Sequence, residues 1–348
     1  MLANASTVMG TDRVKRVLIV GSGGIGRRHL KGYGLTGRAH LAIVEPDAGR
    51  RAEAENLFGI TEAYADIADA DLSSFDLAVI CAPANWHVHL MQVCAEAGLG
   101  FMVEKPLSVT MDGVDAALAL VRERGVEARV GYVRRVAEEV IALRDQILAG
   151  KIGTLRLAYL NSSQEFPKYR PDFQRTYYAR PDMGGGAILD AASHLFDMLI
   201  WLMGRPTDVS CLFDRLVLEG TDTEDTCLVS IRFAGGAMAN VTINQFQKRN
   251  TAQFEFIGTA GNLMLEHSVL QFSDTDAKAW AESRDYMDGL VPTEAHQARF
   301  TIQANAMLDA LEGKPCHLAT LEEARQNLQV ALAAKQSWTD KIIVTIPA

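Results

Sequence analysis

The sequence predicts an α/β protein with two parts: an N-terminal doubly wound Rossmann domain and a C-terminal α+β domain with an open, mostly antiparallel sheet. Residues 14–132 alternate short apolar strands with helical stretches, a pattern typical of parallel βαβ units. Residues 133–348 place several strands in succession, joined by short turns such as Gly235-Gly236, as antiparallel sheets do. A chain of 348 residues accommodates two domains of about 150 residues each, so we place the boundary between 132 and 133.

The composition limits the classes of function. Hydrophobic residues make up 48% of the chain and charged residues 22%, as in soluble globular proteins, and the net charge of −9 argues against a nucleic-acid-binding surface. Five scattered cysteines without a C-x-x-C pair indicate a reduced compartment and no metal site. Residues 1–13 do not resemble a signal peptide, and no apolar run approaches the roughly 18 residues that cross a bilayer. We therefore expect a cytoplasmic protein with neither nucleic-acid nor membrane partners.

The first strand ends in a glycine-rich loop. The apolar run 16–20 leads directly into a G-x-G-x-x-G match at 21–26, with a helix expected over 24–33. In this setting the glycines permit a tight turn, let a pyrophosphate approach the backbone and allow close helix–strand packing. Free N–H groups at the start of the helix favour phosphate. The residues expected to bind a dinucleotide here are Gly21, Gly23, Gly24, Ile25 and Gly26.

Glu45 stands at the end of the second strand, 40–44, close to the expected spacing of about 20 residues after the last glycine of the loop. A carboxylate at this point accepts hydrogen bonds from ribose hydroxyls and repels a 2′-phosphate. It therefore favours NAD over NADP. Arg50 and Arg51 lie nearby and leave NADP open as the less favoured cofactor, and Glu45 has the alternative of being a solvated residue at the start of a loop.

Two further strand ends carry candidate cofactor contacts, because ligands of doubly wound sheets bind beyond the carboxyl ends of the strands. Pro83 and Asn85 follow one strand, and Glu104 and Lys105 follow the next. The remaining elements of this domain are expected to be helix 47–58, strand 76–81, helix 86–97, strand 101–103, helix 111–124 and strand 128–132.

The second domain is expected to hold one sheet and several helices. The predicted strands are 155–160, 209–218, 226–233, 237–244, 253–257, 262–266 and a terminal strand at 341–346. The predicted helices are 137–148, 294–311 and 321–336, while 274–292 has no clear assignment.

A further helix is predicted from the glycine triplet 184–186 to Gly204, and its surface is apolar on most sides. Asp190, His194 and Asp197 sit at i, i+4 and i+7, which places them on one face. Such a polar stripe on a nearly buried helix is either a core histidine satisfied by a carboxylate or part of a site. We interpret the glycine triplet as room for substrate or nicotinamide beside the backbone.

Three motifs now occur in order: the glycine loop, Glu104-Lys105-Pro106, and the triplet helix with its Asp190 and His194. Together they resemble the Gfo/Idh/MocA family, named for glucose–fructose oxidoreductase and inositol dehydrogenase. The resemblance implies hydride transfer between NAD(P) and a secondary alcohol or ketone of a sugar, sugar nucleotide or cyclitol. The chain departs from the family pattern at Ala192, where many members have glycine, and at Ala84, where asparagine is frequent and Asn85 is expected to substitute.

The family pattern assigns roles that agree with the chemistry of the side chains. His194 is the candidate general base, because imidazole titrates near neutral pH. Lys105 would stabilise the developing alkoxide, and the resemblance implies a cis bond to Pro106. Asp190 would bind a neighbouring sugar hydroxyl or support the imidazolium, whereas Asp197 is expected to be a structural partner of the helix or of the histidine.

The segment 164–180 is rich in tyrosine and basic residues, so Tyr177 and Arg175 are candidates for substrate binding, and an interface loop is the alternative. We expect a sugar as the substrate, with a cyclitol second. Two other functions stay open: an NAD-dependent glycoside hydrolase on the same fold, and a catalytically inactive NAD-sensing regulator. The open sheet suggests a homodimer or homotetramer. His29 and His87 are expected to be structural or helix-surface residues.

Overall fold

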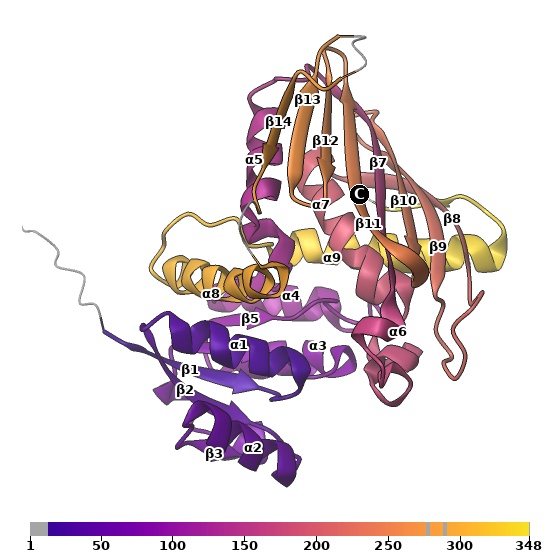
Figure 1. The fold of residues 1–348 in the computed structure, drawn as a ribbon. Coiled ribbons are helices and arrows are strands. Elements are labelled where there is room, and N and C mark those ends of the chain that lie inside the picture. Colours follow the sequence, from indigo (N-terminus) through magenta and orange to yellow (C-terminus); the bar gives the residue numbers. More distant parts are fainter. Residues whose placement is uncertain (1–12, 276–278, 288–290, 348) are drawn as a thin grey trace, which may run out of the picture.

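The computed structural model describes residues 13–275, 279–287 and 291–347, and it confirms the predicted fold class (Figure 1). The lower layer in Figure 1, indigo to purple, is a six-stranded parallel sheet with helices on both faces. The upper layer is a nine-stranded mixed sheet, with α5, α7 and α9 beside it.

The first sheet has the strand order β3-β2-β1-β4-β5-β6, which is the doubly wound order of dinucleotide-binding domains. All of its neighbouring strands are parallel. Its strands are β1 Lys15–Val20, β2 Ala39–Val44, β3 Ala63–Tyr64, β4 Leu77–Ile80, β5 Phe101–Val103 and β6 Ala128–Val130. Its helices are α1 Gly24–Leu35, α2 Ala48–Phe58, α3 His87–Glu96 and α4 Val114–Arg124.

The second sheet has the order β14-β13-β12-β11-β7-β10-β9-β8-β15. Only β7 and β10 pair in parallel among these strands of the described chain; the other neighbours are antiparallel, as the alternating burial along β9 suggests. The strands are β7 Leu155–Glu165, β8 Pro206–Asp214, β9 Thr226–Phe233, β10 Met238–Asn244, β11 Phe246–Gly258, β12 Asn262–Glu266, β13 Val269–Ser273, β14 Glu282–Asp285 and β15 Val344–Thr345.

The helices after residue 133 divide between the two sheets. They are α5 Glu138–Leu148, α6 Phe166–Tyr169, α7 Ser193–Met203, α8 Pro292–Leu311 and α9 Leu321–Asp340. Helix α9 packs against α7 and β8, whereas α8 returns to the first domain and packs on α1. Phe300 and Leu308 of α8 share a buried cluster with Val17 and Leu30. The C-terminal half of the chain thus completes one face of the first domain and brings the two halves together.

One stretch, Pro181–Met203, is long and apolar enough to cross a membrane, although the sequence had suggested no such run. Its 18-residue apolar window is 67% buried inside the protein. Burial of this kind identifies it as a core segment, because the same length and composition suit a helix packed between layers.

Candidate active site

The glycine loop combines two tightly packed positions with two open ones. A Cβ on Gly26 would lie 1.9 Å from the Gly21 carbonyl oxygen, and Gly21 itself has a φ of +99°. Gly23 and Gly24 would present a Cβ to open space, with no atom within 4 Å. Helix α1 begins at Gly24, and Ile25 is half-buried in its first turn. The loop therefore leaves its backbone N–H groups accessible to an anion, which fits the pyrophosphate of a dinucleotide.

Glu45 is buried, so the alternative of a solvated loop residue is wrong. One carboxylate oxygen accepts hydrogen bonds from the Ser22 backbone N–H at 2.9 Å and the Ser22 hydroxyl at 3.1 Å. The other accepts from Asp47 N–H at 3.1 Å and from the Arg50 guanidinium at 2.7 Å. Burial acts to raise the pKa of Glu45, but the hydrogen bonds from Arg50, Ser22 and Asp47 outweigh it and lower the pKa. A negative charge is thus held directly against the glycine loop.

Glu104 faces into the protein. One oxygen lies 2.7 Å from Nε2 of the fully buried His29, and the other accepts a hydrogen bond from the Lys105 backbone N–H at 3.1 Å. A Cβ on Gly131 would come within 2.8 Å of the same carboxylate. Glu104 therefore fixes the backbone of Lys105 from the buried side. His29 is its buried partner, a structural role consistent with the sequence interpretation.

His87 is likewise buried and structural. Its Nδ1 lies 2.9 Å from the Pro106 carbonyl oxygen and its Nε2 lies 2.8 Å from that of Ala82. Burial lowers the pKa of His87. The side chain connects the ends of β4 and β5, where the cofactor contacts were expected.

Lys105, Asp190 and Tyr177 meet at the junction of the two domains. The Lys105 ammonium donates to Asp190 Oδ1 at 2.7 Å and to the Asp190 carbonyl oxygen at 3.1 Å. The Tyr177 hydroxyl donates to the same Oδ1 at 2.9 Å. The bond between Lys105 and Pro106 is cis, as the resemblance implied. Burial of its hydroxyl end, followed by the Asp190 carboxylate, raises the pKa of Tyr177 well above its usual value.

The helix that carries Asp190 is not a continuous α-helix. Ala187–Ala192 forms a π-helical turn, and α7 begins only at Ser193. The buried Glu224 satisfies the first backbone N–H groups of the π-helical turn. Its carbonyl oxygen accepts the N–H of Ala187 and its carboxylate accepts that of Ile188, both at 2.9 Å. A wide turn of this kind is frequent at functional sites.

The glycine triplet does not provide room for a ligand, which corrects the sequence interpretation. A Cβ on Gly184 would lie 3.1 Å from Ala84, one on Gly185 would lie 2.3 Å from the Tyr178 carbonyl oxygen, and one on Gly186 would lie 2.7 Å from Glu224. Protein atoms already fill these spaces. The triplet instead allows the backbone to pack closely against Ala84 and Pro106, which follow β4 and β5, and against the tyrosine-rich stretch 164–180, called the tyrosine segment below.

His194 lies on the first turn of α7 with an edge-to-face contact to the Tyr132 ring, their centroids 6.1 Å apart. Its Nδ1 is buried and has no hydrogen-bond partner within the described residues. Burial, followed by the charges of Lys105 and Arg134 and by His296, lowers the pKa of His194 well below 6.5. The imidazole is therefore neutral at pH 7 and able to accept a proton. The Asp190 carboxylate is engaged by Lys105 and Tyr177, not by this ring.

Asp197 has a partner that the sequence did not suggest. Arg135 donates to both of its carboxylate oxygens at 2.7 to 3.1 Å, and also donates to Glu323 of α9 at 3.0 Å. Arg135 and Asp197 are 2% and 1% exposed, so this pair is fully inside the protein. Asp197 is thus a structural partner of an arginine and not of His194.

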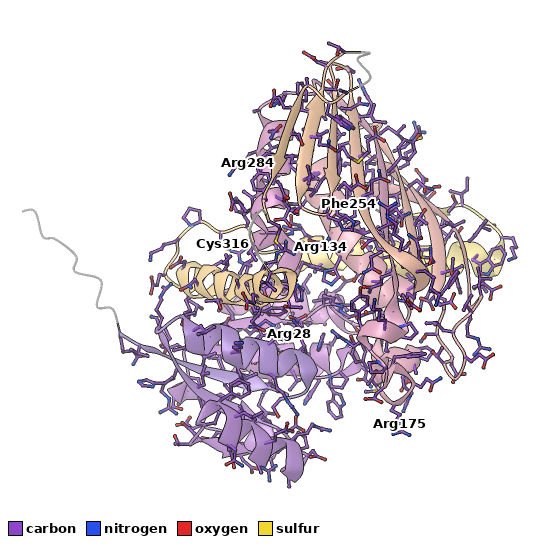
Figure 2. All side chains as sticks on the ribbon, viewed as in Figure 1. Arg28, Arg134, Arg175, Phe254, Arg284 and Cys316 are labelled. Carbon is purple, nitrogen blue, oxygen red and sulfur yellow. The ribbon has the colours of Figure 1, made fainter. Side chains whose placement is uncertain are left out.

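The other candidate residues lie outside this group. Pro83 and Asn85 are exposed beside the end of β4. Arg175 is exposed, and Figure 2 shows it at the outer edge of the tyrosine segment, away from Arg28 and Arg134 at the centre. A cavity of about 430 Å³ lies elsewhere, at the amino ends of β1 and β2, where Arg16 and Glu62 line it. Ligands of such sheets bind at the opposite, carboxyl edge.

Comparisons with known proteins match both halves of the chain to one family. A model described as an oxidoreductase family with an NAD-binding Rossmann fold (GFO_IDH_MocA) matches residues 15–132, and one described as the GFO/IDH/MocA C-terminal domain matches residues 140–264. Inositol 2-dehydrogenase from Leifsonia xyli subsp. xyli is 30% identical over 244 residues, covering 68% of each chain.

Two solved structures share the fold across nearly the whole chain. Levoglucosan dehydrogenase in complex with NADH and levoglucosan superposes with a TM-score of 0.83 at 22% identity, covering 96% of this chain and 100% of that one. The WlbA dehydrogenase from Bordetella pertussis, in complex with NADH and UDP-GlcNAcA, gives 0.82 at 20% identity, covering 97% and 99%.

Proposed function

The chain belongs to the Gfo/Idh/MocA family of NAD-dependent oxidoreductases, and we propose that it transfers a hydride between NAD and a secondary alcohol or ketone of a sugar, sugar nucleotide or cyclitol. One observation carries the proposal. The Lys105 ammonium of the first domain lies 2.7 Å from Asp190 Oδ1 of the second. The charge of Lys105 also lowers the pKa of the neutral His194. A proton acceptor and a cation are thereby placed together beyond the carboxyl end of β5.

The glycine loop and Glu45 would hold the cofactor, whose nicotinamide accepts or returns the hydride when bound. The open faces of Gly23 and Gly24 suit the pyrophosphate, and the Glu45 carboxylate suits an adenosine ribose without a 2′-phosphate. Gly21, Gly26 and Ile25 shape this loop. Glu104 would not bind the cofactor directly; it positions Lys105 by accepting a hydrogen bond from the Lys105 backbone N–H.

In the oxidation direction His194 would take the hydroxyl proton of the substrate, a contribution of about 10²–10⁴-fold for general base catalysis. The Lys105 ammonium would bind the same oxygen as it gains negative charge. Asp190 orients this ammonium, and with Tyr177 it would bind a neighbouring hydroxyl of the ring. In the reduction direction, Lys105 would bind the ketone oxygen and His194 would return the proton.

Substitution of the two central residues tests this proposal. We expect His194→Ala and Lys105→Met each to lower kcat by about 10²–10⁴-fold while NADH still binds, as measured by absorbance of reduced nicotinamide and by calorimetry. Near-normal turnover in both variants would refute the assignment. The same assay separates the two alternatives: a glycoside hydrolase would cleave glycosides without net NADH, and a regulator would bind NAD without turnover of any sugar, acid or polyol.

We further propose that the protein is cytoplasmic and assembles as a homodimer or homotetramer through the open face of its second sheet. The side chains exposed on that face include the large apolar residues Tyr159, Leu212, Leu228 and Met238, each 43% to 54% exposed. They lie on four neighbouring strands, β7, β10, β9 and β8. Such a surface is usually covered in soluble proteins. Light scattering that gives a monomer at micromolar concentration would contradict this assembly.

A further inference from the structure

Positive charge gathers beside the active site without matching carboxylates. Within the described parts of the chain, the guanidinium groups of Arg28, Arg134 and Arg170 form no ion pair with any carboxylate. The protein as a whole carries a net charge of −9, so this local excess is opposite in sign to the molecule. Figure 2 shows Arg28 and Arg134 at the junction of the two domains, on either side of α8.

Arg28 and His296 are brought together by one aromatic ring. The Arg28 guanidinium stacks at 5.7 Å over Phe300, and the His296 ring meets the same ring edge-to-face at 5.5 Å. Gln297 also donates to the Arg28 carbonyl oxygen at 3.1 Å, which joins the start of α8 to α1. Arg28 of the first domain therefore lies next to α8.

Arg134 approaches from the catalytic side. Its guanidinium lies 5.3 Å over the Phe254 ring, and the one polar contact it makes among the described residues is a 3.4 Å hydrogen bond to the Ser162 hydroxyl. The adjacent Arg299 is already paired with Glu139. Burial, followed by the charge of Arg299, lowers the pKa of Arg134 to about 10, against the opposing effect of Glu139.

Arg170 completes the group from the tyrosine segment. Its side chain donates to the Tyr169 carbonyl oxygen at 2.9 Å and is otherwise exposed. Its charge acts on Tyr177 and on Arg28. Burial, followed by Arg28, Arg299, Arg134 and Arg170, lowers the pKa of His296 to about 4, so the charge of each of these arginines acts on that ring.

Arg28 and Arg134 are partly buried and unpaired in the part of the chain that the structure describes, and the exposed Arg170 adds a third positive charge. Partly buried cations without a counter-charge are costly unless something neutralises them. We propose that Arg28, Arg134 and Arg170 bind the carboxylate or phosphate of an acidic sugar or acidic cyclitol, whose reacting carbon lies at Lys105 and His194. This inference rests on the proposed function and narrows its substrate class. Guanidinium groups suit either anion, because their planar donors match two oxygens at once.

The test compares matched neutral and acidic compounds. The probes are D-glucose with D-glucuronate and glucose 6-phosphate, and myo-inositol with myo-inositol 1-phosphate. We measure kcat/KM from NADH absorbance, and calorimetric binding of each probe to the enzyme–NADH complex. We expect at least one acidic probe to be preferred over its neutral partner by on the order of 10- to 100-fold in kcat/KM and in affinity. This is the size of effect that a hydrogen bond to a charged group contributes. Comparison of glucuronate with glucose 6-phosphate identifies which anion fits.

Arg28→Gln and Arg134→Gln should each lose most of that preference, while binding of the neutral partner and of NADH stays unchanged. Arg284→Gln is the control, since this exposed arginine lies on β14, where it pairs with Glu138, and Figure 2 shows it beside the second sheet, away from Arg28. Equal binding of acidic and neutral probes would overturn the inference. Variants that weaken the binding of NADH but not of the acidic probe would also overturn it, because the arginines would then bind the dinucleotide phosphates. If no probe is oxidised, the proposed function fails, and the calorimetric comparison still decides the anion site.

Discussion

At the scale of single residues, the charge around His194 sets the pH range in which it can act. Burial, Lys105, Arg134 and His296 lower its pKa below 6.5, so the unprotonated form that accepts a proton persists under mildly acid conditions. We expect kcat/KM for alcohol oxidation to be flat through pH 7 and to fall only below pH 6.5. A profile that falls off above pH 6.5 on its acid side would contradict this arrangement.

Removal of one neighbouring charge should shift that profile in a known direction. Arg134→Gln takes away a cation that disfavours imidazolium, so the pKa of His194 rises and the acid limb of kcat/KM moves to higher pH. Arg284→Gln should leave the limb in place. The measurement is kcat/KM from pH 5 to pH 8 with a neutral polyol, which keeps the charge of the substrate constant.

Glu45 and Arg50 should affect cofactor choice in opposite directions. Glu45→Gln removes the charge that repels a 2′-phosphate and weakens the contact to Ser22, so the preference for NAD over NADP should fall by about tenfold or more. Arg50→Gln removes a cation available to that phosphate, so NADP binding should weaken. Calorimetric titration with both cofactors checks each change; a Glu45→Gln variant with unaltered preference would show that the carboxylate only supports the loop.

Sequence reasoning located the residues whose motif is local and missed those whose partners are distant. Lys105 and His194 follow recognisable patterns, and the glycine loop has a fixed spacing. Arg28 and Arg134 carry no such pattern, since both lie near the active site only because α8 packs on α1 and on the turn Val133–Val136. The partner of Asp197 was missed for the same reason: Arg135 is 62 positions away in the chain.

At the scale of elements, two glycines of α1 make a matched test of its packing against α8. A Cβ on Gly32 would lie 2.9 Å from the Phe300 backbone, whereas Gly34 is exposed and would meet only a Leu41 methyl at 3.8 Å. Gly32→Ala should destabilise the protein by about 1–3 kcal/mol through overpacking. Gly34→Ala should be neutral or stabilise it by up to about 1 kcal/mol. Chemical denaturation measures both, and equal effects would contradict the close contact.

Element boundaries were predictable where periodicity was strong. The strand 262–266 matches β12, and the helix predicted at 321–336 lies within α9. The helix predicted at 184–204 was too simple, because its π-helical turn depends on Glu224, which approaches from the start of β9. Apolar periodicity reports the buried face of a segment and contains no information about such a distant hydrogen-bond acceptor.

At the scale of the whole molecule, Arg135 connects three segments that flank the junction of the domains. It follows β6 of the first domain, and it binds Asp197 of α7 and Glu323 of α9. Its guanidinium also lies 5.0 Å over the ring of Trp201. A buried ion pair adds little stability over an apolar substitute, but its loss on one side leaves an uncompensated charge.

Arg135→Leu should therefore destabilise the protein by about 3–5 kcal/mol at neutral pH. Burial raises the pKa of Asp197 to about 6 and Arg135 opposes this rise, so in the variant the pKa of Asp197 climbs further. A carboxyl whose folded pKa lies above its unfolded value of 3.8 loses stability as the pH rises through the folded pKa. The loss in the free energy of unfolding caused by Arg135→Leu should consequently be larger at pH 8 than at pH 5. Adding Asp197→Asn to Arg135→Leu removes the titrating group, and denaturant unfolding of this double variant should lose that extra pH dependence; an unchanged dependence would mean that Asp197 is not its source.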